Sequence, residues 1–417
     1  MNADERGFFV FYPRLSAFIR VPFENVDMDI QSLRAAIPAL QHSTYLNTGT
    51  FGPLPRAVSD ELAAGYVLVA EHGAFSPVVR QQIERDGYER ARARVAALLN
   101  VSSDELALTR SSSDGICIVA YGLDWKPGDE VVISDQEHPS GEMPWFVLHK
   151  RYGVNVRVAR VAPEPSETLR NFADAITPRT RLVFASHVCC TTGERLPVKD
   201  ICALAHARNV LAAIDGSHAV GQFGVDLQKF KPDFYVTCGH KWLLGPQGTA
   251  MLFVARRHLD TLQPSWIGWG AQRECSEDLD ALAYEPLDSA RRYEFGTKPW
   301  PLYLGLDRAI WFIQEIGLDA IEQRVAGLAE QFKTRVAEMS GVTLLTPMAA
   351  ARSCGLVSVR VPDFAGADLR DFFWNCERIL VSSNEVQKRV RFSLAFFTTE
   401  SELASALDAL RLSANSR

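Results

Sequence analysis

The sequence predicts an α/β protein whose sheet is mostly parallel and covered by helices. Short apolar runs such as Glu130–Ser134, Arg181–Ser186 and Phe234–Thr237 alternate with stretches of helical periodicity. A short apolar run between turn residues is typical of a buried strand. Strands that alternate with helices form βα units, which build a parallel sheet with helices on its faces.

Composition and charge are those of an ordinary globular protein. Of 417 residues, 47% are hydrophobic and 23% are charged, and the net charge is −6. No basic block stands out, so nothing indicates nucleic acid or an anionic membrane as a partner. The 8 cysteines include no CxxC pair and no Cys/His spacing that suits zinc, so we expect no metal site.

The sequence predicts neither a signal peptide nor a transmembrane helix. Val10–Val26 is partly apolar, but Tyr12 and Arg20 interrupt it. The adjacent Cys189 and Cys190 would form a strained disulfide, so free thiols and a reducing compartment are expected. We therefore expect a cytoplasmic protein.

Two predicted strands end on ionisable side chains. The run Leu211–Ile214 is followed by Asp215, and Phe234–Thr237 leads into Lys241. Ligands of open α/β sheets bind at this edge. A lysine there can form a Schiff base, and an acid can hold a protonated pyridine nitrogen, which are the two groups that pyridoxal 5′-phosphate (PLP) needs. An acid that caps a helix and an ordinary surface lysine would fit these residues equally well.

A strand, a polar turn and a helix follow one another over Leu106–Thr109, Arg110–Gly115 and Ile116–Tyr121. Backbone N–H groups and serine hydroxyls at a helix N-terminus suit a phosphate, although serines are also common helix caps. His138 follows the strand Glu130–Ser134 and could stack on an aromatic cofactor, which most lone histidines do not do. Neither GxGxxG nor GxxxxGK[ST] is present, so dinucleotide and P-loop sites have no support.

The pattern changes after Arg256. Irregular, aromatic, glycine-bearing segments surround Trp266 and Tyr293, and long helical stretches with two further strands follow. We therefore expect three parts: an N-terminal segment that packs with a small domain (residues 1–55), a large domain (56–298) and a small C-terminal α+β domain (299–417).

Together these motifs resemble the class V aminotransferase family, PLP-dependent enzymes that include cysteine desulfurases, selenocysteine lyases and isopenicillin N epimerases. The resemblance runs from Tyr45-Leu46-Asn47 to Arg391-Phe392-Ser393, with the motifs in the family's order. It implies the fold type I architecture of PLP-dependent transferases, with a mostly parallel seven-stranded sheet in the large domain and a smaller α+β domain.

The resemblance also implies a role for each matching residue. Lys241 matches the Schiff-base lysine that moves protons at the substrate Cα, Asp215 the partner of the pyridine nitrogen, and His138 the residue stacked on the ring. The other matches are Ser112, Ser113 and His240 at the phosphate, His218 near the phenolic oxygen, Arg391 at the substrate carboxylate with Asn47 nearby, and Thr297 at the phosphate of a neighbouring subunit. Thr297 thereby implies a homodimer.

The chain departs from the family's pattern at its cysteines. Cys238 stands where the family usually has Ser, and Cys190 where many members have Asn. Cysteine desulfurases carry a persulfide-forming cysteine ahead of the carboxylate arginine, whereas the segment Ile379–Val390 has none. Cys376 comes earlier, in a predicted helix. The sequence therefore predicts that the chain is not a persulfide-relay cysteine desulfurase.

The expected activity is PLP chemistry at the Cα of an amino-acid substrate, and the expected partner is this small molecule. The leading hypothesis is a β-eliminating C–S lyase that acts on a cysteine-derived conjugate, whose S-substituent Trp266 and Trp269 could accommodate. The alternatives are an epimerase similar to isopenicillin N epimerase and a class V aminotransferase. A PLP-binding scaffold without turnover would need neither Lys241 nor Arg391, so their presence argues against it.

Overall fold

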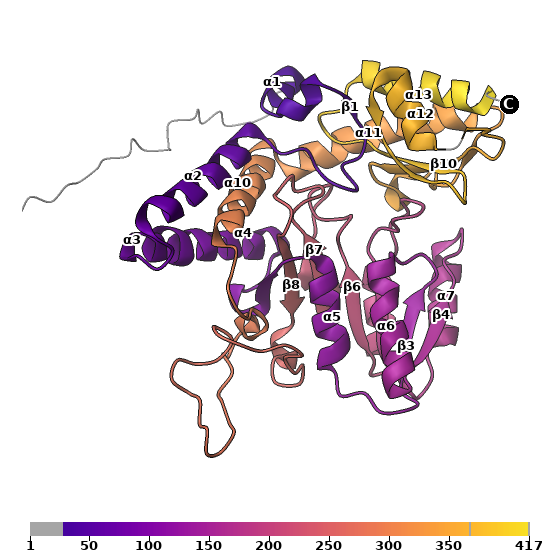
Figure 1. The fold of residues 1–417 in the computed structure, drawn as a ribbon. Helices are drawn as coiled ribbons and strands as arrows, with labels where there is room; N and C mark the ends of the chain where they lie inside the picture. Colours follow the sequence, from indigo (N-terminus) through magenta and orange to yellow (C-terminus); the bar gives the residue numbers. More distant parts are fainter. Residues whose placement is uncertain (1–27, 367, 416–417) are drawn as a thin grey trace, which may run out of the picture.

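The computed structural model describes residues 28–366 and 368–415, which form a large α/β body and a smaller unit beside it (Figure 1). The apolar stretch Val10–Val26 and the start of the expected N-terminal segment lie outside the described residues. No helix in the described part of the chain is long and apolar enough to cross a membrane.

The large body is built on a seven-stranded sheet with the order β2-β8-β7-β6-β5-β3-β4. Its strands are Leu106–Thr109 (β2), Glu130–Ser134 (β3), Asn155–Ala159 (β4), Thr180–Ser186 (β5), Leu211–Asp215 (β6), Phe234–Cys238 (β7) and Ala250–Val254 (β8). Only β8 runs antiparallel to its neighbours, β2 and β7. The prediction of a mostly parallel seven-stranded sheet is confirmed.

Helices cover both faces of this sheet. On β5, Leu182 and Phe184 pack into the core formed with α5 and α6, whereas Val183 and Ala185 pack into the core on the opposite face. Successive side chains of a strand point to opposite faces, so a strand covered on both sides is apolar throughout. The helices of the large body are Arg56–His72 (α2), Pro77–Val79 (α3), the π-helical Arg80–Tyr88 (η2), Glu89–Leu99 (α4), Ser112–Gly122 (α5), Pro139–Tyr152 (α6), Pro165–Ala175 (α7), Val198–His206 (α8), Leu227–Phe230 (α9) and Trp300–Ile316 (α10).

A buried ion pair joins the helical layer to the sheet. Figure 1 shows α2, α4 and α10 side by side. Arg92 of α4 pairs with Glu294, which follows the short 3₁₀ helix Ala290–Tyr293 (η5), and both side chains are buried. The Glu294 carboxylate also accepts hydrogen bonds from Tyr88 Oη (3.0 Å) and from the Leu108 backbone N–H of β2 (2.7 Å). The charges of this pair are thus satisfied inside the core.

The small unit contains a four-stranded antiparallel sheet with the order β12-β13-β10-β9. Its elements are Leu318–Ala337 (α11), Thr343–Leu344 (β9), Leu356–Arg360 (β10), Leu369–Glu377 (α12), Ile379–Leu380 (β11), Ser382–Asn384 (β12), Arg389–Ser393 (β13) and Glu400–Asn415 (α13). The N-terminal helices are Ile30–Ala35 (α1) and the 3₁₀ helix Pro38–Gln41 (η1); further 3₁₀ helices are Ser103–Glu105 (η3), Arg256–His258 (η4) and Ala350–Arg352 (η6).

The N-terminal segment leads directly onto the small unit. Strand Thr44–Tyr45 (β1) pairs in parallel with β11, and the Ser393 backbone N–H donates to the Leu46 carbonyl at 2.8 Å. The side chains of α10 belong to the core of the large body, and the second core begins within α11, where Val325 packs into the first core and Leu328 into the second. The division of the chain at residue 298 stays a prediction.

The loop after β1 contacts the segment that carries Lys241. The Gly52 backbone N–H donates to the His240 carbonyl at 2.7 Å, and a Cβ added to Gly52 would lie 2.1 Å from the Lys241 carbonyl oxygen. A backbone atom cannot swing aside as a flexible side chain can. Only glycine therefore fits at this contact.

A buried carboxyl group joins the ends of β3 and β5. Glu137 accepts hydrogen bonds from the hydroxyls of Ser134 and Ser186 and, at 3.0 Å, from the Ser186 backbone N–H. Complete burial raises the pKa of Glu137 to about 7, although these hydrogen bonds favour the charged form. Its protonation state therefore changes near neutral pH.

We expect Gly52→Ala to lower the free energy of unfolding by about 1–3 kcal/mol, because the added methyl group collides with backbone and forces the loop outward. Thermal or denaturant unfolding measures this. The matched control is Gly327→Ala in α11, where a Cβ meets no atom within 4 Å. That control should be neutral or stabilising by up to about 1 kcal/mol. Equal effects of the two substitutions would contradict the role of the contact.

The free energy of unfolding should depend on pH through Glu137. The folded protein keeps this proton up to about pH 7, whereas an ordinary glutamic acid releases it near its usual value of 4.5. The unfolded state therefore binds fewer protons in this window, and stability falls as pH rises through it, by roughly 3 kcal/mol from this group.

Glu137→Gln should remove this component, so the stability difference between wild type and variant should change between pH 4.5 and pH 7. Denaturant unfolding at a series of pH values measures it. Glu142→Gln is the control, since Glu142 of α6 forms no hydrogen bond or ion pair within residues 28–366 and 368–415. A stability difference independent of pH would show that Glu137 titrates normally.

Candidate active site

A cavity of about 590 Å³ lies at the carboxyl ends of β5, β6 and β7, between the large sheet and the small unit. Its wall comes from the loop around Thr50, the N-termini of α5 and α6, the three strand ends and the hairpin of β12 and β13. The residues that line it include the predicted site residues Ser112, Ser113, His138, Asp215, His218, His240, Lys241 and Arg391. Eight of the ten predicted site residues are thus brought together.

Asp215 and Lys241 meet at this edge because of strand pairing. Asp215 lies opposite Val236 in the parallel pairing of β6 and β7, and the Gly216 backbone N–H donates to the Val236 carbonyl at 2.7 Å. The buried Asp215 carboxylate accepts a hydrogen bond from the Ser217 backbone N–H at 2.9 Å.

His218 lies between Lys241 and Trp242. Its Nε2 is 3.3 Å from Lys241 Nζ, and the Trp242 indole N–H points at its Nδ1 at 3.4 Å. An indole N–H can only donate, so Nδ1 is the acceptor of this contact.

The histidines of the site are held in the neutral form. Burial lowers the pKa of His218 well below its usual value and lowers that of His240 to about 4, and the charge on Lys241 adds to both effects. Desolvation, followed by Lys241, also lowers the pKa of His138. All three imidazoles are therefore uncharged at neutral pH.

The N-terminus of α5 offers free donors to the cavity. Ser111 caps the helix by accepting from the Asp114 backbone N–H at 3.1 Å, and Ser113 Oγ donates to Ser140 Oγ at 2.9 Å. The backbone N–H groups of Ser112 and Ser113 have no partner within the described residues. Helix N-termini attract anions through such groups. The edge of the cavity at α5 therefore suits an anion.

Arg391 is held by two neighbours on one side of its guanidinium group. Nη1 donates to the Cys190 carbonyl and Nη2 to Thr50 Oγ1, both at 3.0 Å, while the buried Nε has no partner within the described residues. Thr50 in turn donates to Asn47 Oδ1 at 2.7 Å. Asn47 therefore orients a partner of Arg391 but does not itself line the cavity.

Thr297 lies apart from this cavity. It is exposed and lines a separate small hollow with Arg110, Phe295 and Lys298. Within one chain the structure does not bring Thr297 to the other predicted residues.

Several residues that line the cavity were not predicted as site residues from the sequence: Thr50, Phe51, Glu137, Gln387 and Arg389. A signal existed for Arg389. It stands two positions before Arg391 on one strand, and residues two apart share a face. Phe51 and Thr50 had no such signal, because their position depends on how the loop folds back across the cavity.

The cysteines divide between the cavity and the surface. Cys190 lines the cavity, and Cys238 lies buried beneath it with its Sγ 3.9 Å from the Ser217 carbonyl oxygen. Cys376 is exposed on α12 and does not line the cavity. The hairpin of β12 and β13 carries no cysteine. Within the described residues, no group of His, Cys, Asp and Glu side chains could hold a metal ion.

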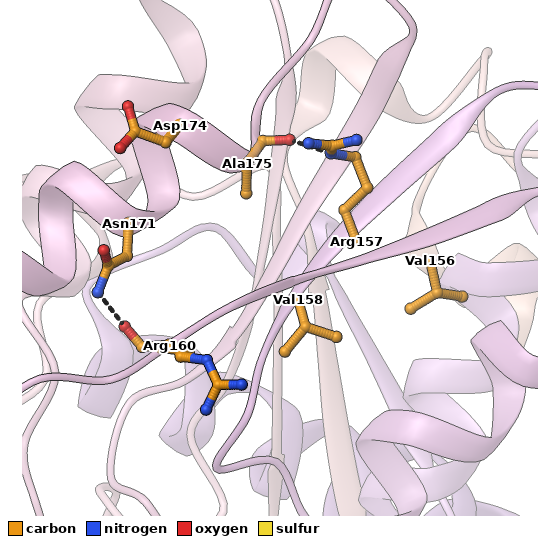
Figure 2. Close-up of a pocket in the computed structure, with 7 residues that line it drawn as sticks. All are labelled: Val156, Arg157, Val158, Arg160, Asn171, Asp174 and Ala175. Atoms are coloured by element: carbon orange, nitrogen blue, oxygen red, sulfur yellow. Dashed lines mark hydrogen bonds between the residues drawn. The ribbon is translucent and has the colours of Figure 1, made fainter.

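A second hollow, of about 450 Å³, lies on the outer edge strand β4 beneath α7 (Figure 2). Arg157 Nε donates to the Ala175 carbonyl at 2.7 Å and Asn171 Nδ2 to the Arg160 carbonyl at 2.9 Å. These bonds fasten α7 to the sheet. No set of acid, amine and free helix N-terminus meets there, so the cavity at Lys241 is the candidate site.

Comparison with known proteins identifies the family. Residues 45–405 match the sequence profile of the family Aminotransferase class-V. The chain is 33% identical to isopenicillin N epimerase from Streptomyces clavuligerus over 379 residues, which are 88% of this chain and 94% of that protein. It is 31% identical to a probable cysteine desulfurase from Methanothermobacter thermautotrophicus over 318 residues, which are 76% and 78% of the two chains.

Among solved structures, the cystine C–S lyase C-DES in complex with its product cysteine persulfide has a TM-score of 0.81 and 26% identity, over 90% of this chain and 99% of that one. A mutant of C-DES with glycine covalently linked to its PLP cofactor has a TM-score of 0.83 and 27% identity, over 91% and 98% of the chains. The chain therefore belongs to the class V aminotransferase family and is a PLP-dependent enzyme of fold type I.

Proposed function

We propose that this enzyme acts at the Cα of an amino-acid substrate and is a β-eliminating C–S lyase for cysteine-derived conjugates. The observation that carries the proposal is that Lys241, Asp215 and Arg391 line one cavity of about 590 Å³. The cavity thus combines a base, an anion for the cofactor ring and a cation for the substrate carboxylate.

The residues of the cavity fit PLP. His240 Nδ1 and Ser217 Oγ are buried without a hydrogen-bond partner within the described residues, and the first N–H groups of α5 are free. Unpaired buried polar groups are costly, so they indicate a missing ligand. Ser112, Ser113 and His240 would hold the phosphate, and His138 and His218 would contact the ring and its oxygen.

Bound PLP supplies an electron-withdrawing ring that stabilises negative charge at the Cα of an attached amino acid. The Asp215 carboxylate would hold the proton on the pyridine nitrogen, since an anion beside that nitrogen favours its charged form. The low pKa of His218 keeps this neighbour of Lys241 neutral, so it adds no positive charge to the cavity.

Arg391 and Lys241 would divide the work on the substrate. The guanidinium fork of Arg391 matches a carboxylate in geometry and charge, and a carboxylate held there would determine which Cα bond faces Lys241. The Lys241 amine would then take the α-proton. Loss of this proton and of the Cβ–S bond releases a thiol, and water converts the remaining enamine to pyruvate and ammonia.

Two comparisons support different outcomes after proton removal. The similarity to C-DES, whose structure is named as that of a cystine C–S lyase, supports elimination. The similarity to isopenicillin N epimerase over 94% of that protein supports an epimerase as the second candidate, in which the proton returns to the opposite face. A class V aminotransferase would use the same base and the same arginine.

We also propose that the chain is not a persulfide-relay desulfurase. The hairpin ahead of Arg391 carries no cysteine, and Cys376 is exposed on α12, outside the cavity wall. Relatives named as cysteine desulfurases belong to the same family, so family membership alone does not decide this. The exposure of Thr297 on its own chain supports the proposed homodimer, in which it would reach a neighbouring site; a cytoplasmic location also stays a proposal.

We expect Lys241→Ala to lose the visible absorbance band of the PLP-bound protein and to lower kcat by roughly 10²–10⁴-fold or more, because the cofactor loses its attachment and the substrate its base. Absorbance spectra and steady-state kinetics measure both effects. Lys199→Ala, an exposed lysine at the start of α8, is the matched control.

Product analysis separates the two candidate functions. Pyruvate from an S-substituted cysteine, without an added keto acid, indicates the lyase. Exchange of α-deuterium with racemisation and no keto product would overturn it in favour of the epimerase.

We expect Cys376→Ser to leave activity on cysteine and on S-substituted cysteines unchanged, since this thiol does not line the cavity. Turnover assays with and without a thiol reductant measure it. If sulfide release from cysteine alone fell more than tenfold, the result would support the persulfide-relay desulfurase hypothesis instead.

A further inference from the structure

We propose that the substrate carries a second carboxylate, remote from its α-carboxylate, and that Arg389 binds it. The inference rests on the proposed function, because it takes Arg391 as the ligand of the α-carboxylate. It names the class of substrate: an amino acid whose side chain ends in an anion.

The first observation is the alternation along β13. Arg389 and Arg391 line the cavity, whereas the intervening Val390 and the following Phe392 are fully buried in the core of the small unit. Strand geometry places the two arginines on one face, with Cα atoms about 6–7 Å apart. Two guanidinium groups at this spacing reach two separate carboxylates of one ligand.

The second observation is that Arg389 has no partner. Arg391 donates to Cys190 and Thr50, but the half-buried Arg389 side chain forms no hydrogen bond or ion pair within residues 28–366 and 368–415. The groups that act on Arg389 are the Cys190 thiol and Arg360; Arg360 lies across the pairing of β10 and β13 and is also positive. A desolvated cation without a counterion is unfavourable, and a bound anion would neutralise it.

The third observation is the polar character of the surrounding wall. Asn384 lies opposite Arg389 and Ser382 opposite Arg391 on β12, and Gln387 lines the cavity from the turn of the hairpin. The carboxyl groups of the cavity are Asp215, Glu137 and Glu142, and none of them pairs with Arg389. The wall therefore presents donors and cations, which suits a carboxylate and disfavours an apolar substituent.

Binding tests the inference without requiring any reaction. The probes are glutarate and its monoamide, which lack the amino group and differ only in the second carboxylate. Calorimetry with the PLP-bound enzyme should show glutarate binding roughly 10- to 100-fold more tightly than the monoamide, the range expected for a charge-assisted hydrogen bond.

Variants assign the effect to Arg389. Arg389→Gln should remove the preference for glutarate and leave the affinity for the monoamide within about threefold, whereas Arg391→Gln should weaken both ligands. Arg389→Lys should keep part of the preference. Arg360→Gln is the control, because it removes the same charge from an exposed neighbour outside the cavity wall. No preference in the wild type, or an equal loss of both ligands in Arg389→Gln, would overturn the inference.

Turnover separates this inference from the lyase proposal. S-(2-carboxyethyl)cysteine should have a KM at least about tenfold below that of its side-chain amide, and Arg389→Gln should abolish the difference while kcat changes little. If the enzyme prefers glutarate but forms pyruvate from neither conjugate, the result supports carboxylate binding by Arg389 and rejects the proposed lyase function. Pyruvate from both conjugates without a glutarate preference would reject the anion site alone.

Discussion

The register of the parallel strands β5, β6 and β7 is the constraint on which the site depends. Ser186 at the end of β5 pairs with Asp215 at the end of β6, and Asp215 pairs with Val236, two residues before the end of β7, so the carboxyl ends of the three strands form one edge. A slip by one residue would turn Asp215 to the opposite face of the sheet. The apolar side chains that pack on both faces prevent such a slip, because it would move the strand's side chains from the core on one face to the core on the other face. The chemistry at the edge is therefore fixed by packing far from it.

The large sheet supplies only half of the site. The other half comes from the β12–β13 hairpin of the small unit and from the loop after β1, which are far apart in sequence. Arg391 joins them, since it donates to Cys190 on the large body and to Thr50 on the loop. The two cavity arginines, Arg389 and Arg391, thus stand on one unit, and Asp215 and Lys241 stand on the other. If the proposed roles hold, the hairpin can change the choice of substrate while the large sheet keeps the cofactor chemistry.

Sequence reasoning succeeded where a residue's position follows from a local rule. Asp215 and Lys241 lie at the ends of apolar runs, and such ends share an edge in a parallel sheet. The serines of α5 were predicted for the same reason, as the start of a helix after a strand. Glu137, Thr50 and Phe51 could not be predicted in this way, because hydrogen bonds and loop contacts between distant segments place them. Thr297 was predicted only from its match to the family's motif, and within one chain it does not line the cavity.

Hydrogen bonds anchor the loop between β1 and α2 at both of its ends. Its start is fixed to the small unit by Leu46 and by Gly49, whose backbone N–H donates to Ser393 Oγ at 3.0 Å. Its end is fixed to the large body where Gly52 meets His240. Only Thr50 and Phe51 separate these two anchored positions. A linker of two residues has little freedom to change its length. We therefore expect a displacement of the small unit to pull on the segment His240–Lys241. A movement that widens the cavity from the side of the small unit would therefore also shift Lys241.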